Sequence, residues 1–254
     1  MKEINDKNIK HIIGIVSGKG GVGKSYVTGS IAVTLAKQGY RVGILDGDVT
    51  GPSIPHMFNI NSGVYGDQEI IYPATSDILG IKIISSALLL AHDEDPIMWR
   101  GPLIGSLVTQ FYTLVNWGAL DFLLIDFPPG TSDVALSAFQ NIPVDGIVLV
   151  TTPQQMVQQI VKKTYKMAEE MKVKLFGVIE NMAYVKLPNT AEKYYLYGQN
   201  KLEDLQKTFP INILGSLPFL PVNTKLVDEG KIEVTDTSEF TLITESLLKE
   251  LNNE

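Results

Sequence analysis

The feature that most constrains the fold of this chain is a glycine-rich stretch, GKGGVGKS, at residues 18–25. An apolar, β-branched run at residues 11–16 precedes it and predicts a buried strand. Residues 24–38 carry apolar side chains at four-residue spacing and predict a helix that ends at Gly39. A second apolar run, residues 41–45, follows. A strand, a helix and a strand within about 35 residues indicate a βαβ unit and therefore a parallel sheet.

The same alternation continues along the chain. The pattern predicts further strands at residues 122–125, 146–150, 175–179 and 211–214, and helices at residues 101–115, 153–171 and 240–251. It is typical of an α/β fold with a doubly wound, mostly parallel sheet. Two stretches fit it less well: residues 59–86, where we expect a small hairpin insertion, and the irregular, tyrosine-rich residues 184–199. Since no linker or repeat divides the chain, we expect a single domain over residues 1–254, with a polar N-terminal tail of about residues 1–10.

The glycine-rich stretch matches the phosphate-binding P-loop pattern G-x-x-x-x-G-K-[ST] in the required strand–loop–helix context. Glycines let backbone N–H groups surround phosphates without a Cβ clash, and the helix N-terminus adds partial positive charge. We expect Lys24 to contact the β- and γ-phosphates and Ser25 to bind Mg²⁺. The residues expected at the nucleotide are Gly18, Lys19, Gly20, Gly21, Val22, Gly23, Lys24 and Ser25. The alternative is a glycine-rich turn that binds nothing.

Carboxylates follow two of the predicted strands. Asp46 and Asp48 come just after residues 41–45, and Asp126 comes just after residues 122–125. Because open α/β sheets bind ligands at the carboxyl ends of their strands, these acids are candidates for a magnesium nucleotide site. Asp126 is the expected Walker-B acid, and Asp46 is the second carboxylate expected near the metal. The alternative for Asp46 is a solvated turn aspartate. Gly130, after two prolines, is expected to offer its N–H to the γ-phosphate.

Composition limits the partners. The net charge of -7 repels phosphate backbones and anionic lipids, so we expect neither nucleic acid nor membrane as a partner. The polar N-terminal residues resemble no signal peptide, and the expected location is cytoplasmic. The absence of cysteine from the sequence excludes disulfides and thiolate metal ligands.

Six motifs occur in order: GKGGVGKS, DGDVTGPSIPHMF, MWRGPL, DFPPGTSD, VTTPQQ and VIENMAY. Together they resemble the Mrp-type iron–sulfur cluster carrier ATPases, which belong to the deviant Walker-A class with partition, septum-placing and arsenite-pump ATPases. The similarity runs from about residue 11 to residue 232. It implies an ATP-hydrolysing homodimer that uses ATP and Mg²⁺ and serves protein clients in metallocofactor assembly.

The resemblance also implies roles for single residues. Lys19 matches a signature lysine that reaches across the dimer interface to the partner subunit's nucleotide, and its alternative is an ordinary exposed lysine. Asp48 matches an aspartate that orients the attacking water, while Asp46 supports the Mg²⁺ indirectly. A lysine that supplies charge to a neighbouring subunit's phosphates acts as an arginine finger does.

Three further positions concern the base and the α-phosphate. Asn181 matches an asparagine that pairs with adenine, and Pro218 and Phe219 match a segment that lines the base pocket. The alternatives are a turn asparagine and a core aromatic. Tyr26 stands where the family usually has a threonine that contacts the α-phosphate, so at this position the backbone N–H is the expected contact.

The chain departs from the family at the cargo site. The family's bridging cluster sits on a CxxC pair after the ENM segment, and residues 184–199 contain no cysteine. An iron–sulfur cluster bound in the family's usual manner is therefore not expected. The tyrosines there, for which packing or a dimer contact is the expected role, are Tyr184, Tyr194, Tyr195 and Tyr197.

Two functions from different classes remain open. The first is a dimeric, ATP-hydrolysing carrier of metallocofactor assembly, and the second is a nucleotide-gated adaptor that recruits a protein client without carrying a cluster. A third, a membrane- or DNA-positioning ATPase, is less consistent with the sequence, because the predicted helix at residues 240–251 has acidic rather than cationic surroundings. We expect that helix to pack on the sheet.

Overall fold

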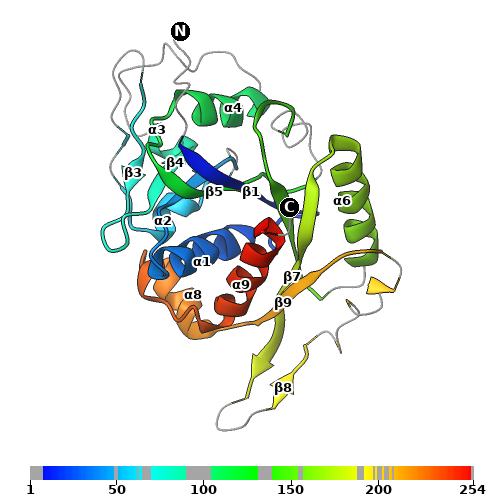
Figure 1. The fold of residues 1–254 in the computed structure, drawn as a ribbon. Coiled ribbons are helices and arrows are strands. Elements are labelled where there is room, and N and C mark those ends of the chain that lie inside the picture. Colours follow the sequence, from blue (N-terminus) through cyan, green and yellow to red (C-terminus); the bar gives the residue numbers. More distant parts are fainter. Residues whose placement is uncertain are drawn as a thin grey trace.

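A mostly parallel β-sheet forms the centre of the computed structural model (Figure 1). The structure describes residues 8–48, 51–61, 63–64, 70–89, 104–130, 139–153, 157–187, 192–196, 198, 202, 206–207 and 209–252. The strands in these ranges are β1 (Ile9–Ser17), β2 (Val42–Asp46), β3 (Ala74–Thr75), β4 (Lys82–Ser85), β5 (Leu120–Asp126), β6 (Gly146–Thr151), β7 (Lys174–Lys186), β8 (Lys193–Tyr194) and β9 (Ile213–Pro218). Their order is β3-β4-β2-β5-β1-β6-β7-β8, and β9 pairs with β7.

Helices cover both faces of this sheet. They are α1 (Lys24–Lys37), α2 (Ile54–Met57), α3 (Ser86–Leu89), α4 (Ile104–Leu114), α6 (Val157–Met171), α8 (Pro221–Asp228) and α9 (Ser238–Asn252), with a 3-10 turn, η1 (Ile232–Val234). Because successive side chains of a strand point to opposite faces, Ile13 and Ile15 of β1 pack with α1 and α9, whereas Ile12 and Val16 pack with α4 and α6. Figure 1 shows these two helix layers on either side of the sheet. The central strands β2 and β6 are buried along their whole length, which is why they are almost entirely apolar.

The parallel register brings three strand ends together. Asp126 lies opposite Ile15 of β1 and Asp46 of β2, and Asp46 lies opposite Ser85 of β4. Helix α1 begins at the same edge, directly after Gly23, whose φ of 77° lies in the left-handed region. The carboxyl edge of the sheet therefore collects the P-loop and the predicted carboxylates, as the sequence predicts.

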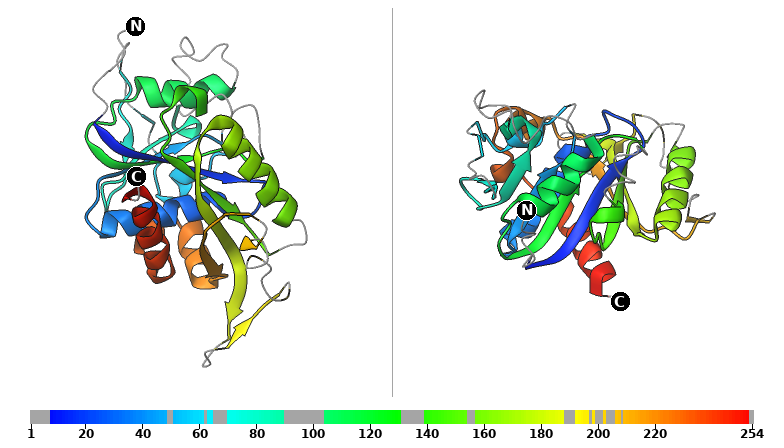
Figure 2. Two further views of the ribbon diagram at one scale, coloured as in Figure 1. Left: turned by 45° about the vertical axis from the view of Figure 1, so that its right-hand side comes forward. Right: turned by 90° about the horizontal axis from the view of Figure 1, so that it is seen from above.

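Two predictions about irregular segments need correction. Residues 59–86 do contain the expected hairpin, in which β3 pairs antiparallel with β4, but β4 also pairs in parallel with β2 and so belongs to the main sheet. Residues 184–199 are not irregular throughout: β7 continues to Lys186 and its end pairs antiparallel with β8. This pair projects from the rest of the molecule (Figure 2). Periodicity missed both extensions because their pairing partners are set by tertiary contacts.

The C-terminal helix packs as expected. Phe240, Ile243, Leu247 and Leu251 of α9 are buried in the cluster formed with α1. The lysines of α6 at positions 162, 163 and 166 are exposed, as a solvated helix face requires. Among the helices that the structure describes, none combines the length and the apolar character needed to cross a bilayer.

Candidate nucleotide and metal site

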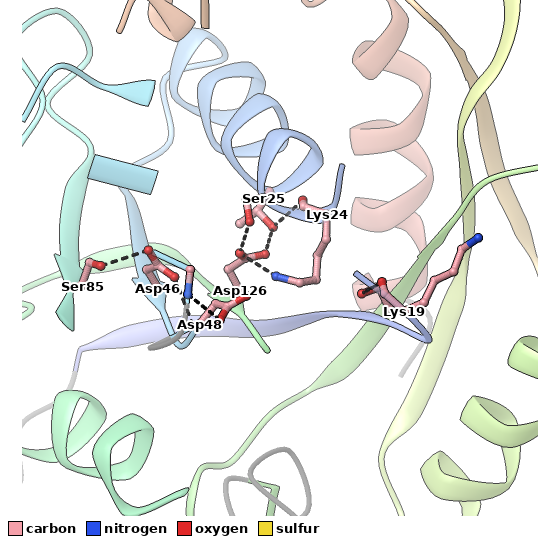
Figure 3. A network of polar contacts seen from close by, with 10 residues as sticks. Lys19, Lys24, Ser25, Asp46, Asp48, Ser85 and Asp126 are labelled. Atoms are coloured by element: carbon pink, nitrogen blue, oxygen red, sulfur yellow. Dashed lines mark hydrogen bonds and ion pairs between the residues drawn. The ribbon is translucent and has the colours of Figure 1, made fainter. Parts of the chain in front are cut away.

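Asp126 is the centre of the candidate site. It ends β5, its side chain is fully buried, and each of its oxygens has a short contact (Figure 3). Oδ2 accepts a hydrogen bond from Ser25 Oγ at 2.6 Å and lies 2.7 Å from Lys24 Nζ. Oδ1 accepts a hydrogen bond from Thr28 Oγ1 at 2.6 Å. The P-loop lysine, the P-loop serine and the strand-end carboxylate thus meet at one place, as the motif predicts.

Lys24 has an incomplete set of partners. Its side chain is 6% exposed, and besides the ion pair its Nζ finds no hydrogen-bond acceptor in the part of the chain that the structure describes. A buried ammonium has three donors and is costly to leave unsatisfied. Beside it, a Cβ placed on Gly20 or Gly21 would meet no atom within 4 Å, so the loop is open at these positions. A phosphate group fits this arrangement because it supplies both acceptors and negative charge.

Asp46 is a second buried carboxylate at this edge. It is 1% exposed, so the alternative of a solvated turn aspartate is wrong. It accepts hydrogen bonds from Ser85 Oγ at 3.0 Å and from the backbone N–H of Asp48 at 3.2 Å. Burial, followed by the charge of Asp126, raises the pKa of Asp46 to about 7.

The oxygen atoms at this edge suit one kind of metal. Mg²⁺ is usually held by one or two carboxylates together with hydroxyl, water and phosphate oxygens, and Asp126, Asp46 and Ser25 match that set. No group of three or more His, Asp or Glu side chains that would hold a metal ion by itself occurs among the residues of known placement. The arrangement therefore fits Mg²⁺ carried in with a nucleotide better than a metal held by the protein alone.

Asp48 lies beside this pair of carboxylates. It is partly buried, and its Oδ1 accepts a hydrogen bond from the N–H of Gly51 at 3.2 Å. Figure 3 shows it next to Asp46 at the end of β2. Asp48 therefore lies at the same edge of the sheet as Asp46 and Asp126.

The two lysines of the loop point in different directions. Figure 3 shows the ammonium of Lys24 directed at Asp126 and that of Lys19 directed away from it. The backbone carbonyl of Lys19 accepts a hydrogen bond from Ser17 Oγ at 3.0 Å, which holds the start of the loop. Lys19 therefore does not take part in the Lys24–Asp126 contact within its own chain.

Gly130 is held differently from the prediction. Its φ is 92°, and its N–H donates to the carbonyl of Ser17 at 2.8 Å. In this structure the N–H points to β1 rather than into the loop, because the chain after β5 continues alongside β1: the N–H of Phe127 donates to the carbonyl of Ile15 at 3.0 Å. A contact with a γ-phosphate would require this hydrogen bond to open.

Asn181 lies under the P-loop. It belongs to β7 and is 3% exposed, so the alternative of a turn asparagine is wrong. Its Nδ2 donates to the carbonyl of Val22 at 2.9 Å, and a Cβ on Gly23 would come within 2.3 Å of the same nitrogen. One of the two N–H donors of the amide is thus used by the loop.

The predicted base-pocket segment follows β9. Pro218 ends that strand opposite Tyr184, and the N–H of Phe219 donates to the carbonyl of Tyr184 at 2.8 Å. Phe219 is 39% exposed, which corrects the alternative that it is a core aromatic. An exposed ring next to a strand end is available for stacking on a flat ligand.

Tyr26 points away from the loop. Its hydroxyl accepts a hydrogen bond from Asn223 Nδ2 at 3.3 Å, and its ring packs edge-on against Phe240 with centroids 6.0 Å apart. Its side chain therefore serves the packing of α1 on α8 and α9. The backbone N–H therefore stays the predicted phosphate contact at this position.

Side chains of the tyrosine-rich segment pack against one another. Tyr184 is 3% exposed, its ring lies 5.8 Å from that of Tyr195, and Lys193 Nζ lies 4.3 Å from the centre of its ring. Packing is therefore the observed role of Tyr184. Tyr194 is 57% exposed. Tyr197 lies outside the described residues.

Sequence reasoning missed two hydroxyls at the site. Ser85 reaches Asp46 from β4, and no local pattern announces it. Thr28 stands four residues after Lys24 on the same helix, and that spacing, which places two side chains on one face, was available as a signal.

Comparison with known proteins agrees with this geometry. Residues 8–252 match the ParA family, in the group described as NUBPL iron-transfer P-loop NTPase. The chain is 42% identical over 253 residues to the iron-sulfur cluster carrier protein of Clostridium perfringens, covering 96% of this chain and 88% of that protein. It is 37% identical over 259 residues to the cytosolic Fe-S cluster assembly factor CFD1 of Saccharomyces cerevisiae, covering 97% and 88%. The solved structure of a nucleotide-binding protein from Archaeoglobus fulgidus in complex with ADP is 40% identical, with a TM-score of 0.82 over 92% of each chain.

Proposed function

This chain belongs to the ParA family, in its group of iron-transfer P-loop NTPases, and on that premise we propose that it is a dimeric ATPase that serves metallocofactor assembly. The observation that carries the proposal is the meeting of Lys24, Ser25 and Asp126 at the carboxyl edge of the sheet. Catalysis of phosphoryl transfer is largely a matter of position and charge, and this edge supplies both.

In the proposed mechanism Lys24 exchanges partners. In the structure its ammonium contacts Asp126, and on nucleotide binding it would turn its donors to the β- and γ-phosphates. Asp126 and Ser25 would then hold the Mg²⁺, with Asp46 supporting it. When bound, the Mg²⁺ would neutralise negative charge on the transferred phosphoryl group. Asp48 positions the attacking water from the other side of the phosphates.

We infer that the base lies beside Asn181 of β7 and the segment that follows β9. Asn181 keeps its donor on the carbonyl of Val22 and accepts from the adenine amino group with Oδ1, while Pro218 and Phe219 line the pocket. Guanine carries a carbonyl oxygen, an acceptor, where adenine carries its amino group, a donor. This arrangement should therefore bind ADP more tightly than GDP. In Asn181→Ala the affinities for ADP and GDP should converge, and an unchanged ratio would contradict the base contact.

The first experiment is a binding and turnover measurement on three variants. Lys24→Ala should lower ATP affinity by about 100-fold, because it removes hydrogen bonds from a charged donor. Asp48→Asn should bind ATP within about threefold of the wild type and turn over about 10²-fold more slowly. Lys37→Ala is the matched control, since Lys37 lies at the far end of α1 and donates to the carbonyl of Thr235. Wild-type affinity in Lys24→Ala would refute the site.

The cargo distinguishes two versions of this function. The names of the bacterial and yeast relatives indicate a carrier or assembly factor, and we extend that role, in the cytoplasm, to this chain. The sequence contains no cysteine, and Tyr184 and Lys193 pack together where the family places its ligands, which favours the adaptor alternative. Anaerobic reconstitution with iron and sulfide separates the two: iron retained after gel filtration supports a carrier. A colourless, iron-free protein that captures a client only with ATP supports an adaptor.

A further inference from the structure

Thr28 lies one helical turn beyond Lys24, on the face of α1 that meets β5. Its side chain is fully buried, and its Oγ1 lies 2.6 Å from Asp126 Oδ1 and 3.1 Å from the carbonyl of Lys24. We propose that Thr28 is a positioning residue that holds Asp126 in the orientation needed to bind Mg²⁺. The inference rests on the proposed function, because it concerns the carboxylate assigned to the metal.

The contacts of Asp126 divide between its two oxygens. Oδ2 is shared by Lys24 and Ser25. In the proposed mechanism both of these groups change partners when a magnesium nucleotide binds. Oδ1 contacts Thr28, which lies outside the P-loop motif. When the loop residues leave, the hydrogen bond from Thr28 is the contact that remains to prevent the carboxylate from rotating.

The backbone of Asp126 is anchored separately. Its carbonyl accepts a hydrogen bond from the N–H of Gly47 at 2.9 Å, which ties the end of β5 to the end of β2. That contact fixes where the residue sits and leaves the side-chain torsions free. Thr28 supplies the missing constraint, so the strand pairing and the helix hydroxyl together determine where Oδ2 points.

The hydroxyl has one proton for two acceptors. An ionised carboxylate is the stronger acceptor and lies closer than the Lys24 carbonyl, so the proton goes to Asp126. Serine would preserve this bond, while valine would preserve the shape of the side chain and remove the bond. Thr28→Val and Thr28→Ser are therefore a matched pair at a fully packed position.

The test is the magnesium dependence of ADP binding. In EDTA, Thr28→Val should bind ADP with an affinity within about twofold of the wild type. Its Mg²⁺ midpoint, the concentration that gives half of the magnesium-dependent gain in ADP affinity, should be about tenfold higher. The reason is that loss of such supporting hydrogen bonds weakens metal sites by about 10- to 100-fold. Thr28→Ser should restore the wild-type midpoint. Thr34→Val is the control, since Thr34 is also buried on α1 and donates to the carbonyl of Ser30 at 2.7 Å.

The outcomes separate this inference from the proposed function. An unchanged Mg²⁺ midpoint in Thr28→Val, or an equal loss of ADP affinity with and without Mg²⁺, would overturn the positioning role alone. A wild-type protein whose ADP affinity does not respond to Mg²⁺ would overturn the magnesium site and with it this inference. If Thr28→Val does not fold, the same midpoint compared between Thr28→Ala and Thr28→Ser decides the question.

Discussion

Glu180 is a buried acid next to Asn181, outside the contacts assigned to nucleotide binding. It is 2% exposed, and Ser216 Oγ donates to its Oε2 over a long 3.5 Å. Burial raises the pKa of Glu180 from 4.5 to about 7. The folded state therefore binds a proton that the unfolded state has released between these two pH values. It follows that the free energy of unfolding falls as the pH rises from about 4.5 to about 7, and the ionised carboxylate destabilises the fold above that range.

Replacing Glu180 tests this directly. We expect Glu180→Gln to be more stable than the wild type at pH 8.5 by up to about 3 kcal/mol, the free-energy equivalent of that pKa difference. The advantage should fade as the pH falls towards 4.5, where the wild-type carboxyl is protonated in the folded state and half protonated in the unfolded state. The pH dependence contributed by Asp46 is the same in the wild type and in Glu180→Gln, so it cancels in the difference between their free energies of unfolding. Urea unfolding at the two pH values measures the difference, with the exposed Glu245→Gln as the control. If Glu180→Gln were equally stabilising at pH 8.5 and pH 4.5, the proposed effect of the buried carboxyl on stability would be contradicted.

At the scale of elements, the P-loop is packed directly against α6. A Cβ on Gly18 would lie 2.4 Å from Ile160 Cγ2 and 2.9 Å from Ile160 Cγ1. Such distances are too short for real contacts, so the loop and the helix approach each other as closely as a glycine allows. The first glycine of the motif therefore has a packing role in addition to its place in the phosphate loop.

This contact predicts that a smaller side chain at position 160 restores part of the stability lost when Gly18 is replaced. Gly18→Ala should lower the free energy of unfolding by about 1–3 kcal/mol, as overpacking usually does. Ile160→Ala in the same chain should recover part of that loss, because it removes the atoms that the new methyl group meets. Gly20→Ala is the control, since a Cβ there meets nothing within 4 Å. Denaturant unfolding of the wild type, Gly18→Ala, Ile160→Ala and the double variant gives the coupling energy, and additive losses would show that the two elements do not interact in this way.

At the scale of the whole molecule, the orientation of Lys19 concerns association. Its ammonium points away from Lys24 and Asp126 of its own chain (Figure 3). Each copy carries a net charge of -7, so long-range charge opposes the approach of two copies. A lysine that meets a partner's phosphates would replace part of that repulsion with attraction. We therefore expect association to depend on bound triphosphate.

Mass measurement tests this expectation. With Mg²⁺ and a non-hydrolysable ATP analogue, the wild type should double from 27.9 kDa, and Lys19→Ala should stay single at the same concentration. Because a charge supplied in trans stabilises the transition state, ATP turnover in Lys19→Ala should fall by about 10³-fold, while ADP affinity changes little. Lys249→Ala, on the exposed face of α9, is the control. A Lys19→Ala protein that dimerises and hydrolyses ATP at the wild-type rate would contradict the proposed role.

Local sequence was sufficient for most elements and for the family. The strand–loop–helix pattern, the apolar strands and the periodic α9 are all present, and the resemblance to iron–sulfur cluster carriers is confirmed by the family match. These features depend on neighbours within a few residues, which is why periodicity and turn residues find them. The short β3 and β8 are different, because two-residue strands exist only through the strand they pair with.

The sequence by itself determined the identity of the fold and the chemical types at the site, since a P-loop and strand-end acids need only short motifs and a parallel sheet. Only the tertiary structure decided which groups touch: Ser25 meets Asp126 across 101 residues, and Asn181 meets Val22 across 159. It also turned Tyr26 to the packing of α9 and the Gly130 N–H to Ser17. The physical reason is that a side chain's partner depends on register, helix rotation and burial, which are properties of the packed chain.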